Sequence, residues 1–217
     1  MTLLRTALMA AGLLLAVGTA TGASAKIVVV TDVETGYPDL GNVSVPGYGA
    51  PWTTPIIMTE QGIGKVVVFC DDLNHVVYVE GGQNLHYLIG QVTVDGNGNP
   101  LKDHVSNEMG QLADIGRYDF SKGDEAGAIA AQAAIWGLEY GVAVTSSDGA
   151  IQHDITADLK VTDDGRGLAT GLIGLDNQQS QITGGVPEPA AWAMMLMGFG
   201  GLGAAMRGAR RRQGLAV

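Results

Sequence analysis

The chain has a single cysteine, Cys70, among its 217 residues, which excludes an internal disulfide. Basic side chains are also scarce, because 12 Lys and Arg stand against 22 Asp and Glu and give a net charge of −10. Such a chain repels phosphate backbones, so we expect no nucleic-acid partner. The four histidines are scattered without ligand spacing, and with only one cysteine the sequence predicts neither a metal site nor a cofactor.

Long apolar runs occur only at the two ends of the chain. At the N-terminus, Arg5 precedes the apolar run 7–17, and the small residues Ala23, Ser24 and Ala25 precede Lys26. A basic residue, an apolar core and an A-x-A site are typical of a secretory signal peptide, predicted here over 1–25. Because this segment contains no cysteine, a lipid-modified N-terminus is excluded.

The second apolar run covers residues 190–206 and contains no charged side chain. As a helix it would be roughly 25 Å long, close to the thickness of a hydrocarbon core, and it is predicted to cross a membrane. Four arginines follow it directly: Arg207, Arg210, Arg211 and Arg212. Positive charge stays on the cytoplasmic side, so the domain before the helix should face outward.

This C-terminal segment resembles the PEP-CTERM sorting signal of Gram-negative bacteria. The parts that match are a Pro-Glu-Pro motif, a tryptophan, the apolar glycine-containing helix and the terminal basic cluster, found here at Pro187, Glu188, Pro189, Trp192, Arg210, Arg211 and Arg212. The resemblance covers 186–212 and implies an exosortase as partner, residence in the inner membrane before processing, and delivery to the cell surface or extracellular matrix. The alternative is an ordinary C-terminal anchor that is never cut.

Between the two ends, one exported domain is predicted over 26–175, followed by a polar linker over 176–185. Residues 26–186 hold 7 basic and 21 acidic side chains, a net charge of −14. This charge suits solubility outside the cell or cation-bridged contact with polysaccharide.

The fold class predicted for this domain is α+β, with an antiparallel β-meander or barrel-like sheet packed against two central helices. Alternation and turn signals predict strands over 27–33, 65–69, 76–79, 85–94 and 142–145. Ser106 is expected to cap a helix through about Arg117, and Asp124 a second helix through Tyr140 that Gly141 ends. An amphipathic stretch follows near 151–161.

Cys70 requires an explanation, because an exported protein with one cysteine cannot pair it internally. One interpretation is a small buried apolar side chain at the end of a strand. A second is a cysteine hydrolase nucleophile, which Asp71 and Asp72 oppose because neighbouring carboxylates raise the pKa of a thiol.

A third interpretation comes from the helix over 124–140. Gln132 shares a face with Ile129, Ala133 and Trp136, and a buried carboxamide without partners costs about 1–3 kcal/mol. Either the amide of Gln132 bonds a neighbouring strand edge, or its carbonyl carbon is acylated onto a thiol.

Phe69-Cys70-Asp71-Asp72 and Ala131-Gln132-Ala133-Ala134-Ile135-Trp136 together resemble the thioester domains of bacterial surface adhesins. The resemblance covers about 60–140 and implies an internal thioester between Cys70 and Gln132 that reacts with a nucleophile on a target surface. It further implies that Asp72 is the acid of the cysteine motif and that Trp136 shields the bond from water. Ala131 departs from the family pattern, which has threonine at this position.

These patterns predict an exported, exosortase-sorted protein that attaches to a surface through a thioester. Each molecule would react at most once, so the protein is not expected to be an enzyme. Its target would be an unknown surface nucleophile or exopolysaccharide. The alternative is a non-covalent envelope or exopolysaccharide-associated module in which Cys70 is buried and free.

Overall fold

A computed structural model describes residues 26–38, 42–79, 84–165, 168–175 and 177–184. The predicted signal peptide, the Pro-Glu-Pro motif, the membrane helix over 190–206 and the terminal arginines lie outside the described residues. Within those residues, every helix is too short or too polar to span a bilayer.

Six antiparallel strands close into a barrel in the order β1, β3, β4, β8, β7, β5, and β5 pairs with β1 again. Their bounds are Lys26–Thr35 (β1), Ile56–Glu60 (β3), Gly64–Cys70 (β4), Leu85–Gln91 (β5), Thr170–Gly174 (β7) and Gln181–Gly184 (β8). Two short strands, Val43–Ser44 (β2) and Thr145–Ser146 (β6), form a separate pair.

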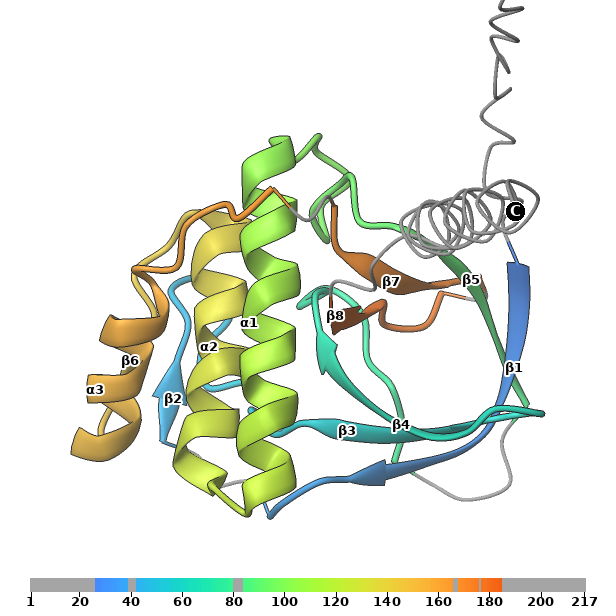
Figure 1. Ribbon diagram of the computed structural model, residues 1–217, viewed down its shortest axis with the longest axis horizontal. Helices are drawn as coiled ribbons and strands as arrows, with labels where there is room; N and C mark the ends of the chain where they lie inside the picture. Colours follow the sequence, from blue (N-terminus) through green and yellow to red (C-terminus); the bar gives the residue numbers. More distant parts are fainter. Residues whose placement is uncertain (1–25, 39–41, 80–83, 166–167, 176, 185–217) are drawn as a thin grey trace, which may run out of the picture.

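Three helices stand beside the barrel (Figure 1): Asp103–Lys122 (α1), Glu125–Tyr140 (α2) and Gly149–Asp158 (α3). Helix α1 contacts β4 and β8 of the barrel, α2 packs on α1, and α3 packs on the other side of α2. Asp124 is the N-cap of α2 and accepts a hydrogen bond from the Gly127 N–H, while Gly141 ends the helix at φ 62°. Both ends of α2 therefore agree with the sequence prediction.

The core has three parts that follow this arrangement. Strand alternation fills the barrel with Val30, Met58, Val68 and Tyr87, all fully buried. A second cluster, centred on Phe69 and Ile135, joins the barrel to α1 and α2. The third lies between α2, α3 and the β2–β6 pair and includes Cys70, Ile129 and Trp136. Helix α2 is apolar on nearly all sides because it lies between two of these clusters.

The structure corrects several predicted elements. The α+β class and the barrel-like antiparallel sheet are confirmed, but three helices accompany the barrel instead of two. Helix α1 begins at Asp103 and runs past Arg117 to Lys122; Ser106 is buried inside it, and its hydroxyl donates to the Val92 carbonyl oxygen at 2.6 Å. Residues 76–79 form no strand, and of 142–145 only Thr145 belongs to one.

Three strands of the barrel were not expected: β3, β7 and β8. Strand β3 directly follows a segment rich in Gly and Pro, and the turn signals of that segment extended the predicted loop up to the strand. Strand β8 lies within 176–185, where a polar linker was predicted. Its Gln181 and Ile182 pair with β4 and β7, and both are completely buried. Because β8 fills the gap between β4 and β7, β4 has no free edge.

Candidate functional site

Cys70 is the last residue of β4, and its side chain leaves the barrel toward α2. It is 4% exposed and belongs to the core cluster that contains Trp136. Its thiol donates to the Asp72 carbonyl oxygen, with Sγ and O 3.2 Å apart. The chain then turns through residues 71–75, so Cys70 lies where a strand ends and a polar loop begins.

Gln132 is fully buried on α2, and its carboxamide lies against Cys70. Its Oε1 accepts the Cys70 backbone N–H at 2.7 Å, and its Nε2 donates to the Cys70 carbonyl oxygen at 2.7 Å. The structure thus brings together the two residues that the sequence singled out. The contacts are those of a side chain with the end of a strand, which was one of the alternatives for Gln132.

Burial and the neighbouring Asp71 carboxyl raise the pKa of the Cys70 thiol well above its usual range. The Asp72 backbone and the Trp136 side chain oppose this shift, but burial is the largest cause. The sulfur is therefore held as a neutral thiol, which disfavours the thiolate that a cysteine hydrolase requires.

Trp136 lies one helical turn after Gln132 and is 1% exposed. Its indole Nε1 is buried and forms no hydrogen bond of ordinary geometry in the described structure, although it lies close enough to Cys70 to lower the pKa of the thiol. Trp136 and Cys70 line the same cavity of about 280 Å³, here named the Cys70 cavity. The tryptophan therefore places an N–H donor beside the Cys70 sulfur. The Cys70 cavity connects this sulfur with the solvent.

Asp72 makes more contacts than the sequence suggested. Its Oδ1 accepts the backbone N–H groups of Asn74 and His75, and its Oδ2 lies 2.5 Å from Nδ1 of His75. His75 lines the Cys70 cavity, so an Asp–His pair stands next to the cysteine. The i, i+3 spacing of Asp72 and His75 was the available signal, but the histidines were judged only as metal ligands.

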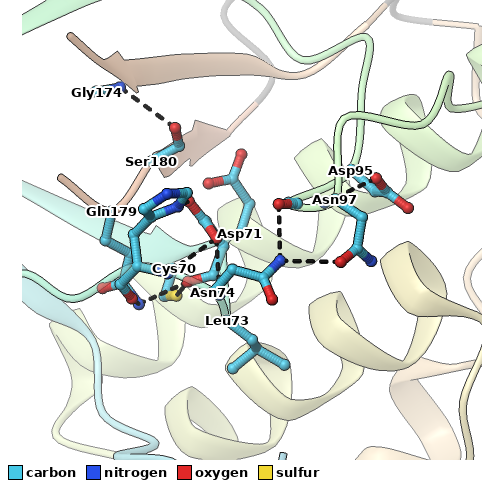
Figure 2. A network of polar contacts seen from close by, with 12 residues as sticks. Cys70, Asp71, Leu73, Asn74, Asp95, Asn97, Gly174, Gln179 and Ser180 are labelled. Carbon is cyan, nitrogen blue, oxygen red and sulfur yellow. Dashed lines mark hydrogen bonds and ion pairs between the residues drawn. The ribbon is translucent and has the colours of Figure 1, made fainter. Parts of the chain in front are cut away.

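The loop that carries Asp72 is fixed from two sides. Figure 2 shows Asn74 reaching the turn of Asp95 and Asn97; its Nδ2 donates to Gly96 O at 2.7 Å and to Asn97 Oδ1 at 3.1 Å. From the other side, Gln179 Nε2 donates to the carbonyl oxygens of Asp72 and His75. Gln179 lies in the segment predicted to be a linker, which instead helps to hold the site.

Two carboxyl groups near Cys70, those of Asp71 and Glu139, are buried, which the sequence analysis did not predict, although it named Asp71 as a neighbour that raises the pKa of the thiol. Burial and the neighbouring Asp72 raise the pKa of Asp71 to about 8, and burial with Asp71 raises the pKa of Glu139 well above its usual range. Each has one buried oxygen without a hydrogen-bond partner in the described structure, Oδ1 of Asp71 and Oε2 of Glu139. Nothing in the sequence predicted that these two acids would be buried.

No three His, Cys, Asp or Glu side chains within the described ranges come together as a metal site would require. The polar groups around Cys70 are a thiol, a carboxamide, an indole N–H, an Asp–His pair and the buried carboxyls of Asp71 and Glu139. Such a set is suited to acyl transfer, because it combines an acyl carbon, a sulfur, hydrogen-bond donors and a base.

Comparison with known protein families matches the PEP-CTERM protein-sorting motif over residues 185–212. This agrees with the expectation from Pro187, Glu188, Pro189 and the terminal arginines, and it implies export and an exosortase as the processing partner. Comparisons with curated proteins and with solved structures found no match. The resemblance of residues 60–140 to thioester adhesins gains no support from these comparisons.

Proposed function

We propose that this exosortase-sorted surface protein attaches covalently to its target through a thioester between Cys70 and Gln132. One observation carries the proposal: the carboxamide of a fully buried glutamine is held by two 2.7 Å hydrogen bonds to the only cysteine in the chain. The sorting motif accounts for export and surface delivery, and the thioester accounts for what the exported domain does there.

The hydrogen bond from the Cys70 N–H to Gln132 Oε1 has a chemical consequence. This oxygen would become the carbonyl oxygen of the thioester, and it carries negative charge in the tetrahedral intermediate of acyl transfer. A backbone N–H already aimed at it stabilises that charge in the manner of an oxyanion hole. The hydrogen bond from Nε2 is the one that closure of the thioester removes.

The closing step is balanced without a co-reactant. The Cys70 sulfur attacks Cδ of Gln132, the Cδ–Nε2 bond breaks, and the thiol proton leaves with the amide nitrogen as ammonia. Burial then protects the product, because opening it by water would regenerate a thiolate in surroundings that raise the pKa of Cys70. The Cys70 cavity admits a nucleophile to a bond that is otherwise enclosed.

Intact mass of the purified exported domain tests the proposal. We expect a mass lower than the sequence mass by one ammonia, and methylamine should add to Gln132 and free Cys70 for alkylation. Cys70→Ala and Gln132→Glu are matched controls that should each show their full sequence mass and no methylamine adduct. A wild-type domain at full sequence mass, with a thiol that alkylates without amine treatment, would contradict the thioester.

The second candidate is a non-covalent envelope or exopolysaccharide-associated module. The same contacts favour it in one respect, because the Gln132 amide satisfies both main-chain polar groups of Cys70 at the end of β4. In that case the pair acts as a structural clasp between the barrel and α2, and the mass measurement separates the two functions.

A further inference from the structure

We infer that His75, oriented by Asp72, is a general base that directs the acyl group of Gln132 to a neutral hydroxyl group of a carbohydrate. This inference rests on the proposed thioester and adds to it the class of nucleophile and a further catalytic residue. It is carried by the Asp–His pair, by the lining of the Cys70 cavity and by the unpartnered N–H of Trp136.

The hydrogen bond to Asp72 defines the state of the imidazole ring. With Nδ1 committed to Asp72 Oδ2, the neutral ring carries its proton on Nδ1 and a lone pair on Nε2. The loop around the pair is held by Asn74 and Gln179, so the ring is positioned by contacts on both sides of the loop. A carboxylate that orients a histidine in this way prepares Nε2 to accept a proton.

A general base accelerates attack on a thioester by a hydroxyl group more than attack by an amine. A free amine attacks a thioester unaided, whereas a hydroxyl group must lose its proton as it attacks and gains much from a positioned base. His75 and Cys70 line the same cavity, so the base and the sulfur of the proposed acyl bond face one space. An amine-directed site would have little use for this arrangement.

The lining of the Cys70 cavity points to the same class of nucleophile. Among the residues that the structure describes, His75 and Cys70 are the only titratable side chains that line it, so these residues offer neither an ammonium group nor a phosphate a fixed opposite charge. The lining instead combines neutral hydrogen-bonding groups with apolar faces: Thr35, Thr54, Gln179, Pro51, Trp52 and Leu73. Trp52 is 59% exposed at this site. Neutral polar groups beside aromatic and apolar surfaces fit a sugar ring.

The step is balanced as follows. The hydroxyl oxygen bonds to Cδ of Gln132, the Cδ–Sγ bond breaks, and the hydroxyl proton passes to Nε2 of His75 and then to the Cys70 sulfur. The products are an ester on Gln132 and a free thiol. Trp136 contributes its unpartnered Nε1–H, which is buried beside Cys70 and can donate to the sulfur while it carries negative charge.

Two probes and two variants test the inference. The wild-type domain is incubated separately with glycerol and with methylamine, and adducts are measured by intact mass over time. We expect wild type to form both adducts, and His75→Gln to form the glycerol ester at least about 100-fold more slowly while keeping its methylamine rate. His153→Gln, at a histidine whose side chain is 82% exposed on α3, is the matched control and should behave as wild type.

The outcomes separate this inference from the proposed function. Full sequence mass of the wild-type domain overturns both. A normal thioester mass with equal glycerol rates in wild type and His75→Gln overturns the general base alone, as does a variant that loses both adducts equally. If the His75→Gln variant does not form the thioester, the adducts of the wild-type protein test the inference. A wild-type protein that forms a methylamine adduct but no glycerol ester overturns it.

Discussion

At the scale of single residues, the unusual feature of this site is the number of buried polar groups around one cysteine. Asp71, Asp72, Gln132 and Glu139 are all at most 6% exposed. Gln132 has two strong partners, whereas Asp71 and Glu139 each keep a buried oxygen without one. The carboxyl groups of Asp71 and Glu139 are held in their neutral form, because the charged form would lose its hydration.

Asp71 therefore makes the stability of the domain depend on pH. Its pKa is raised to about 8 in the folded state, so the folded protein binds a proton that the unfolded chain releases near pH 4. The free energy of unfolding should be highest at about pH 4 and fall as the pH rises to about 8, by a few kcal/mol. Glu139, whose pKa is raised as well, adds to the slope in the same direction.

Urea unfolding between pH 4 and 9 measures this dependence. Asp71→Asn should flatten the curve, because the variant cannot ionise at this position, and Asp103→Asn, in the exposed first turn of α1, should leave the slope unchanged. A wild-type unfolding free energy that rises from pH 4 to 8 would contradict this account of Asp71.

At the scale of elements, the position of Gln132 against Cys70 depends on how closely α1 and α2 approach each other and β4. Gly116 on α1 permits that approach, since a Cβ there would lie 2.5 Å from Phe69 Cζ and 2.9 Å from the Ala131 Cβ. Phe69 precedes Cys70 on β4, and Ala131 precedes Gln132 on α2. One glycine thus sets the distance between the two segments that carry the site.

Gly116→Ala should destabilise the domain by about 1–3 kcal/mol, because the added methyl group overpacks a filled contact and outweighs the gain in helix propensity. Gly149→Ala in α3 is the matched control. Nothing lies within 4 Å of its Cβ position, and we expect it to gain about 0.5 kcal/mol. Thermal and urea unfolding measure both; equal effects of the two substitutions would refute the close contact at Gly116.

At the scale of the whole molecule, an acidic exported domain precedes a short basic tail. Residues 26–186 carry a net charge of −14, whereas all charged side chains after residue 188 are arginines. The PEP-CTERM motif over 185–212 couples this charge separation to sorting, because positive charge next to an apolar segment is retained on the cytoplasmic side.

Replacing Arg207, Arg210, Arg211 and Arg212 with glutamine should therefore disturb both membrane retention and processing. Fractionation of cells that carry a tagged protein measures both, as surface delivery and as molecular weight. Neutralising Lys102, Lys122 and Lys160 removes positive charge from the exported domain and should change neither. Unchanged delivery and unchanged molecular weight after the arginine replacement would contradict the role of the basic cluster.

The sequence by itself determined the parts of this protein whose signal is local. The tail could be identified because its order of motif, apolar run and basic cluster is written in consecutive residues. Helix α2 could be bounded because Asp124 and Gly141 supply a cap and a left-handed residue at its ends. Cys70 and Gln132 stood out for a similar reason, as a lone cysteine and as a polar side chain on an apolar helix face.

The tertiary structure alone decided what depends on contacts between distant residues. Strand β8 is polar and short, and only the gap between β4 and β7 makes it a strand. Asp71 and Glu139 look like any other acids until the fold removes water from them. The Asp72–His75 pair is local in sequence, but its place beside Cys70 is fixed by Asn74 and by Gln179, 104 residues further along the chain than His75. Local patterns pointed to Cys70 and Gln132, and long-range packing sets their surroundings.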